Sequence, residues 1–287
     1  MGFFTWIASV WRKPIGAGGS PAPSTPGGDS RPEETMNKKA LCVGINDYPG
    51  TQNDLSGCVN DCGDWADFLS SRGFAVTRLL DSQATRAGIK GALAGMLSSC
   101  AAGDVAVFTY SGHGSSVVDT SGDEPDGKDE TICAHDGNVT DDELREILDK
   151  TPAGVRVTVV LDSCHSGTAT RFARPGGPKA RYMPPSDPKV RELCERLPSS
   201  KAMLSETSMV EVLFSGCKAS EYSYDAEFGG RPNGAFTRAA LDVLKKGGRL
   251  TNSDLYAAIK KRLPSNDYPQ TPQFEGSDAN KAREAFA

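Results

Sequence analysis

The chain has 287 residues, 38% of them hydrophobic, and a formal net charge of −5. This length and apolar content are sufficient for one α/β domain with additional segments, and the acidic balance argues against a nucleic-acid-binding protein. The eight cysteines are scattered singly and form no Cys-x-x-Cys pair. This distribution is typical of reduced thiols in a cytoplasmic protein and argues against a disulfide framework.

Residues 1–37 are predicted to lie outside the folded domain. Residues 1–13 include two tryptophans and two phenylalanines, but this apolar run is too short to span a membrane, and its basic residues follow it instead of preceding it. A disordered or loosely docked tail and a short anchor for a partner or a membrane surface are the two alternatives for it. Residues 14–35 are rich in glycine, proline and serine, which is typical of a linker.

From residue 38 onward, apolar runs alternate with segments of helical periodicity. The patterns predict strands at 39–45, 74–80, 104–110, 131–134, 155–161, 210–217 and 273–275, and helices at 55–71, 85–99, 140–150, 235–246 and 253–263. Thr140 opens a predicted capping box, and Asn252 or Ser253 is the expected cap of the last helix. Such alternation predicts an α/β fold, with a mostly parallel sheet of about six strands and helices on both faces. Residues 277–287 are expected to form a C-terminal tail.

Two of the predicted strands end in reactive side chains. Strand 104–110 is followed by Ser-Gly-His-Gly, which contains His113, and strand 155–161 is followed by Asp-Ser-Cys, which contains Cys164. In open α/β sheets, ligands and chemistry are found at the carboxyl ends of the strands. We therefore expect His113 and Cys164 to face each other across one cleft if the two strands are parallel neighbours.

A cysteine and a histidine in this arrangement can carry out acyl transfer. A thiol with a pKa of about 8.5 is mostly protonated at neutral pH, whereas the thiolate is the nucleophile. An adjacent imidazole can accept the thiol proton and later protonate the leaving amine. The alternative is that Cys164 is merely a small buried residue and His113 a loop histidine.

These motifs resemble those of the metacaspases, which are caspase-like cysteine peptidases. The resemblance rests on Tyr-Ser-Gly-His-Gly at 110–114 and Asp-Ser-Cys-His-Ser-Gly at 162–167. The 51 positions from His113 to Cys164 are close to the spacing of about 50 known for caspases. The resemblance implies a cysteine endopeptidase that acts in cell death or defence.

The same resemblance divides the chain into parts. It implies a caspase-like catalytic domain at 38–276, made of a large-subunit-like part at 38–170, a basic linker at 171–200 and a small-subunit-like part at 201–276. The partners of the protein are expected to be protein or peptide substrates with basic residues at the cleavage site. We expect a monomer in the cytoplasm that binds neither nucleic acid nor membrane.

The resemblance also assigns roles around the reactive pair. It implies that the backbone amides of Gly114 and Cys164 hold the oxyanion. The pocket for the residue before the scissile bond is expected to be lined by Cys58, Asp61, Ser111 and Asp162. Two buried carboxylates require a cation, so we expect cleavage after arginine or lysine. Compensation of a helix dipole is the alternative role for Asp61.

The linker contains basic residues that such an enzyme could cleave. The candidates for processing, by the enzyme itself or by an upstream protease, are Arg171, Arg174, Lys179, Arg181, Lys189 and Arg191. A solvated basic loop is the alternative.

Calcium is the cofactor that the resemblance suggests. Hard oxygen ligands of the kind that calcium prefers are offered by Asp123, Asp126, Asp129, Asp141 and Asp142. A further aspartate of calcium-activated metacaspases corresponds to Arg171 here, which weakens the expected site. Helix capping is the alternative role for Asp141 and Asp142.

Two other classes of protein are open to the sequence. One is a caspase-like scaffold that binds partners and has lost catalysis, although the intact pair of His113 and Cys164 argues against it. A zinc protein is the other, with ligands Cys58, Cys62, Cys164 and His113, but these lack the close spacing of zinc motifs.

Overall fold

The computed structural model describes residues 36–119, 122, 127–164, 177–186, 188, 192 and 206–287. The strands are β1 (Lys38–Gly44), β2 (Ala75–Leu80), β3 (Val105–Ser111), β4 (Gly114–Val118), β5 (Lys128–Ala134), β6 (Gly137–Thr140), β7 (Arg156–Asp162), β8 (Lys179–Ala180), β9 (Glu211–Ser215), β10 (Tyr224–Phe228), β11 (Arg231–Gly234) and β12 (Gln273–Glu275). The helices are α1 (Cys58–Ser71), α2 (Arg86–Ser98), α3 (Asp141–Leu148), α5 (Ala235–Leu244), α6 (Asn252–Ile259) and α7 (Asp278–Lys281). Short 3-10 turns include η1 (Thr51–Asn53).

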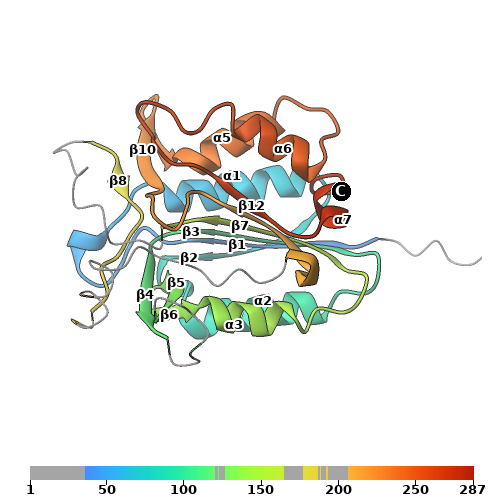
Figure 1. The fold of residues 1–287 in the computed structure, drawn as a ribbon, viewed down its shortest axis with the longest axis horizontal. Helices are drawn as coiled ribbons and strands as arrows, with labels where there is room; N and C mark the ends of the chain where they lie inside the picture. Colours follow the sequence, from blue (N-terminus) through green and yellow to red (C-terminus); the bar gives the residue numbers. More distant parts are fainter. Residues whose placement is uncertain are drawn as a thin grey trace, which may run out of the picture. The chain divides into compact units, whose positions relative to one another are not determined.

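A six-stranded sheet forms the centre of the molecule, in the order β12-β9-β7-β3-β1-β2. Every pair of neighbours is parallel except β12, which runs antiparallel to β9. Helices α1, α5 and α6 cover one face, and α2 and α3 cover the other (Figure 1). The predicted fold, a mostly parallel sheet of about six strands between helices, is confirmed.

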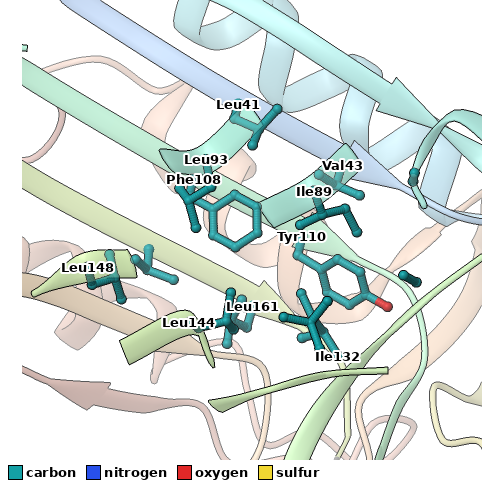
Figure 2. Packing of buried hydrophobic residues seen from close by; sticks show 14 of the residues in the cluster. Leu41, Val43, Ile89, Leu93, Phe108, Tyr110, Ile132, Leu144, Leu148 and Leu161 are labelled. Atoms are coloured by element: carbon teal, nitrogen blue, oxygen red, sulfur yellow. The ribbon is translucent and has the colours of Figure 1, made fainter. Parts of the chain in front are cut away.

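The central strands are buried on both faces, as expected for a parallel sheet between helices. In β1, Leu41 and Val43 contribute to one core with residues of α2 and α3, and Figure 2 shows this packing. Ala40 and Cys42 belong to the other core, which α1, α5 and α6 complete. The alternation follows from the two-residue period of a strand, and burial on both faces explains the nearly continuous apolar runs in the sequence.

Two small antiparallel sheets were not predicted, and both flank the carboxyl ends of the central strands. One has the order β4-β5-β6 and the other β11-β10-β8. The sequence of β4 is Gly-Ser-Ser-Val-Val, which is too short and polar to give a clear pattern. Strands β10 and β11 form a hairpin around Gly229 and Gly230, both at positive φ. This glycine pair is a recognisable turn signal.

Two expectations near the C-terminus were wrong. The cap of α6 is Thr251, not Asn252 or Ser253, because the Thr251 hydroxyl accepts from the amide of Asp254, whose carboxylate accepts from the Thr251 amide in return. Residues 277–287 do not form a free tail, since they contain α7 and the buried Phe286. Within the part of the chain that the structure describes, no helix is long and apolar enough to cross a membrane.

Candidate active site

Strands β3 and β7 are parallel neighbours, which was the condition for the expected cleft, and Ser111 lies opposite Asp162 in the register. The chain segments that follow these two residues therefore begin side by side at one edge of the sheet. His113 and Cys164 lie two positions beyond these paired residues. Both side chains are buried.

The carbonyl oxygen of Arg181 connects the two segments. It accepts a hydrogen bond from the amide of Gly114 at 2.9 Å and another from the amide of Cys164 at 3.1 Å. These are the two amides for which the resemblance implies the role of oxyanion donors. The backbone of the linker therefore occupies the position between the histidine and cysteine loops.

The side chain of Arg181 is fully buried and is surrounded by three carboxylates. Its guanidinium nitrogens lie 2.6 Å from Asp61, 3.1 Å from Asp162 and 2.9 Å from Asp225. One nitrogen also donates to the backbone carbonyl of Asp162 at 3.2 Å. The predicted pair of carboxylates thus contacts a cation, and it comes from the chain itself.

Neutral donors hold each carboxylate in place. Asp162 accepts from the amide and the hydroxyl of Thr237, at 3.0 and 2.7 Å. Asp61 accepts from the amide of Gly234 at 3.0 Å. A β carbon at Gly234 would overlap Asp162 and the guanidinium, so this position requires glycine. These hydrogen bonds stabilise part of the negative charge on the carboxylate oxygens. The burial of the carboxylates therefore does not depend on the guanidinium alone.

Burial shifts the protonation equilibria in this pocket. It raises the pKa of Asp61 to about 6, although the positive charge of Arg181 acts in the opposite direction. Burial alone would lower the pKa of Arg181, but the surrounding carboxylates, Asp162 foremost, hold it well above its ordinary value. The guanidinium is therefore charged throughout the physiological range.

His113 is oriented by backbone and aromatic contacts. Its Nε2 lies 2.6 Å from the carbonyl oxygen of Asn53, to which it must donate. The His113 amide donates to the Tyr48 hydroxyl at 2.9 Å, and the two rings are 4.8 Å apart. This bond leaves Nδ1 unprotonated in the neutral ring, and Nδ1 has no hydrogen-bond partner among the described residues. Burial lowers the pKa of His113 to about 4, so the imidazole is neutral at pH 7.

The Cys164 thiol contacts the backbone of one residue of the small-subunit-like part. Its Sγ accepts from the amide of Ser223 at 2.7 Å and donates to the carbonyl of the same residue at 3.2 Å. Ser223 in turn donates to Asp162 through its hydroxyl. Cys164 and the carboxylates around Arg181 therefore share one supporting residue.

The other predicted pocket residues are close to these groups. Ser111 is buried opposite Asp162, and no ion pair or hydrogen bond of Arg181 within the described chain includes it. Burial raises the pKa of the Cys58 thiol, and the charge of Arg181 opposes that shift, so Cys58 lies within electrostatic range of the guanidinium.

Sequence reasoning missed Asp225, Ser223 and the carbonyl of Asn53. Asp225 is the only acidic residue in the run Tyr-Ser-Tyr-Asp-Ala, a pattern that could have indicated a buried carboxylate. The roles of Ser223 and Asn53 depend on backbone atoms and leave no residue-type signal. Among the processing candidates, Arg171, Arg174, Lys189 and Arg191 lie outside the described residues.

The predicted calcium ligands are only partly described. Asp129, Asp141 and Asp142 are described, whereas Asp123 and Asp126 are not. In the described ranges, no three acidic, histidine or cysteine side chains are close enough to hold an ion. This result argues against the zinc alternative, whose four ligands are all described. The calcium site includes Asp126 and stays a prediction.

A nucleophile loop and a histidine loop at adjacent strand ends, on a sheet of this topology, define a cysteine peptidase of the caspase type. The chain belongs to the family described as "Caspase domain", which it matches over residues 37–282. It is also 33% identical to Metacaspase-1 of Mycosarcoma maydis over 284 residues, which cover 84% of this chain and 70% of that protein. The protein is therefore a caspase-like cysteine peptidase related to the metacaspases.

Other comparisons agree. The chain is 45% identical over 143 residues to Metacaspase-4 of Arabidopsis thaliana, although these residues cover only 46% of this chain and 34% of that protein. A crystal structure of a Geobacter sulfurreducens protein matches with a TM-score of 0.67 and 34% identity, covering 87% of this chain and 98% of that one. Caspase-1 from Spodoptera frugiperda, at 14% identity and a TM-score of 0.54 over 84% of this chain and 86% of that one, is similar in fold.

Proposed function

We propose that this peptidase cleaves after arginine or lysine, with Cys164 as nucleophile and His113 as general acid and base, and that its own Arg181–Tyr182 bond is a substrate. One observation carries the proposal. The carbonyl oxygen of Arg181 accepts from two backbone amides while its guanidinium contacts three buried carboxylates. A peptide bond held at both its carbonyl and the side chain before it is positioned as a substrate.

Hydrogen bonds on both sides of the bond support this arrangement. The Arg181 amide donates to the carbonyl of Ser223 at 2.9 Å. Beyond the bond, the Met183 amide donates to the carbonyl of Gly114 at 2.9 Å, and the ring of Tyr182 lies 6.3 Å from that of Tyr222. Residues on either side of the cleavage position therefore contact the enzyme.

The proposed reaction has the following steps. The thiol exchanges its bond to Ser223 for one to Nδ1 of His113, which takes the proton, and the sulfur adds to the carbonyl carbon of Arg181. The amides of Gly114 and Cys164 stabilise the oxyanion, each by about 3 kcal/mol. His113 then protonates the Tyr182 nitrogen, the C–N bond breaks, and water hydrolyses the thioester to release the new carboxylate.

Purified wild type, Cys164→Ala and Arg181→Gln chains test self-cleavage on a denaturing gel, with mass determination of the fragments. We expect wild type to yield a fragment that begins at Tyr182, and both variants to stay intact at that bond. Arg181→Lys is the matched control and should still be cleaved. Equal cleavage of Cys164→Ala would mean that another protease cuts the linker.

Peptide substrates test the specificity independently of the linker. Fluorogenic peptides that end in arginine or lysine should be hydrolysed, and the same peptide ending in aspartate should not. Measuring each rate with calcium and with a chelator tests the predicted calcium dependence. No hydrolysis of any peptide under either condition would favour the inactive scaffold over the peptidase.

A further inference from the structure

The linker residues before Arg181 bind as an added strand. In β8, Ala180 pairs with Tyr224 and Lys179 pairs with Asp225, both antiparallel. In Figure 1, β8, β10 and β4 lie together at one end of the central sheet. Lys179 lies in β8, and Arg181 follows directly after the strand ends at Ala180.

The ammonium group of Lys179 contacts the η1 turn. Its Nζ donates to the carbonyl oxygen of Gln52 at 3.3 Å and also to that of Asp54. The stem of Lys179 is exposed, so these two bonds fix the end of a side chain that water could otherwise solvate. A lysine two residues before the cleavage position thus has a defined binding site.

The hydrogen bonding of the η1 turn leaves these carbonyl oxygens available as acceptors. Within η1, the amides of Asn53 and Asp54 donate to the carbonyls of Gly50 and Thr51. The next three carbonyl oxygens, of Gln52 and Asn53 in η1 and of Asp54 just after it, lie at the C-terminal end of the turn, where backbone acceptors are left for other donors. Lys179 binds the first and the third of them. The middle one, of Asn53, accepts from Nε2 of His113.

We infer that η1 is a second specificity site, which takes a lysine two residues before the arginine at the cleavage position and, by holding its carbonyls, positions His113. The inference rests on the proposed cleavage after arginine and adds a second basic position to it. Its physical basis is that a cation bound to the carbonyls on both sides of Asn53 restrains the acceptor that orients the imidazole. Burial lowers the pKa of His113 and the charge of Lys179 lowers it further, which agrees with this proximity.

Three peptides with one fluorogenic leaving group test the site, with sequences Lys-Ala-Arg, norleucine-Ala-Arg and Glu-Ala-Arg. Norleucine keeps the aliphatic stem of lysine and removes the charge. We expect kcat/KM for the lysine peptide to exceed that for norleucine on the order of 10-fold, since charge-assisted hydrogen bonds at an exposed site are of moderate strength. Part of this difference should appear in kcat and not only in KM. The glutamate peptide should have the lowest kcat/KM of the three.

The outcomes separate this inference from the proposed function. Equal hydrolysis of all three peptides would overturn the second site and leave arginine specificity intact. Hydrolysis of none of them would overturn both. A preference for lysine confined to KM would retain the site and overturn its effect on His113.

Self-cleavage gives a second test in the whole chain. Lys179→Met should slow the appearance of the fragment that begins at Tyr182 on the order of 10-fold, since the methionine cannot donate to the two carbonyls. Lys150→Met is the matched control, because Lys150 forms an exposed ion pair with Glu146 of α3, and its rate should equal wild type. Unchanged self-cleavage in Lys179→Met would contradict the inference.

Discussion

Asp225 combines two contacts that are usually made by different residues. Its carboxylate contacts the Arg181 guanidinium and also accepts from the amides of Ser56 and Gly57, which precede α1. An amide oxygen can accept the two backbone bonds, but it cannot supply the negative charge. Asp225→Asn therefore separates the binding of arginine from the support of α1.

We expect Asp225→Asn to lower kcat/KM for an arginine peptide roughly 30-fold, which corresponds to about 2 kcal/mol for one charge-assisted contact. Fluorogenic assays provide the rates, and thermal unfolding verifies that the variant folds. Asp242→Asn is the control, since Asp242 forms a surface pair with Arg238, and its rate should not change. Wild-type turnover by Asp225→Asn would exclude Asp225 from the pocket.

The pH dependence of self-cleavage should report Asp61. Burial raises the pKa of this carboxyl to about 6. Asp61 is therefore charged above pH 6 and pairs with the guanidinium, and this attraction is lost as the pH falls through 6. His113 stays neutral over that range because burial lowers its pKa to about 4. The rate should thus fall around pH 6, from its value at neutral pH to the lower rate of a chain whose residue 61 is uncharged.

The control for this profile is Asp61→Asn. It should cleave more slowly at neutral pH, and its rate should not fall between roughly pH 7 and 5, because the titrating group is gone. An acidic limb at the same pH in wild type and Asp61→Asn would assign the titration to another group. The rates come from timed gels in buffers of constant ionic strength.

At the scale of elements, strong periodicity decided what could be predicted. Strand β12 was expected at 273–275 and has those bounds. The other five strands of the central sheet were found because each carries a mainly apolar run. Strands β4 and β6 have no such run. Their extended conformation is stabilised by antiparallel pairing with β5. The Thr251 cap was missed because Asn252 and Ser253 are equally good capping residues by type.

The same distinction holds for the candidate site. His113, Cys164, Asp61 and Asp162 could be singled out because residue type and position at a strand or helix end suggest their chemistry. Asn53 acts through a carbonyl that every residue type possesses. A sequence pattern cannot identify such a residue, because its role depends on the backbone conformation of the turn, which directs the carbonyl toward His113.

A buried ion pair joins α3 to β9. Arg145 contacts both carboxylate oxygens of Glu211, with Nη1 3.1 Å from Oε2. The Glu211 side chain is 1% exposed and that of Arg145 22%. Removing the arginine leaves a buried carboxylate without a partner, which costs more than the pair itself contributes.

We expect Arg145→Met to reduce the free energy of unfolding by about 3 kcal/mol, at the lower end for buried pairs because Arg145 is partly exposed. Urea titration at neutral pH measures the change. The double variant Arg145→Met/Glu211→Gln should regain part of the loss, since the uncompensated charge is removed. Lys150→Met again serves as a surface control and should leave the unfolding midpoint in place.

At the scale of the molecule, both sides of the proposed cleavage contribute to one fold. Strands β9 and β12 follow the linker, yet β9 pairs in parallel with β7, which precedes it. One core contains Trp65 of α1 together with Phe236 of α5 and Phe286 near the C-terminus. The rings of Trp65 and Phe286 are 5.7 Å apart. Cleavage between residues 181 and 182 breaks none of these contacts.

We therefore expect the two products, residues 1–181 and 182–287, to remain a non-covalent complex after cleavage. Size-exclusion chromatography of cleaved wild type should give one peak that contains both fragments, at the elution volume of intact Cys164→Ala. Strong denaturant should separate them, because the association depends on sheet pairing and apolar burial and not on a covalent bond. Two separate peaks under native conditions would mean that the shared sheet does not survive without the linker bond. Cleavage would then inactivate the enzyme instead of opening the active site to other substrates.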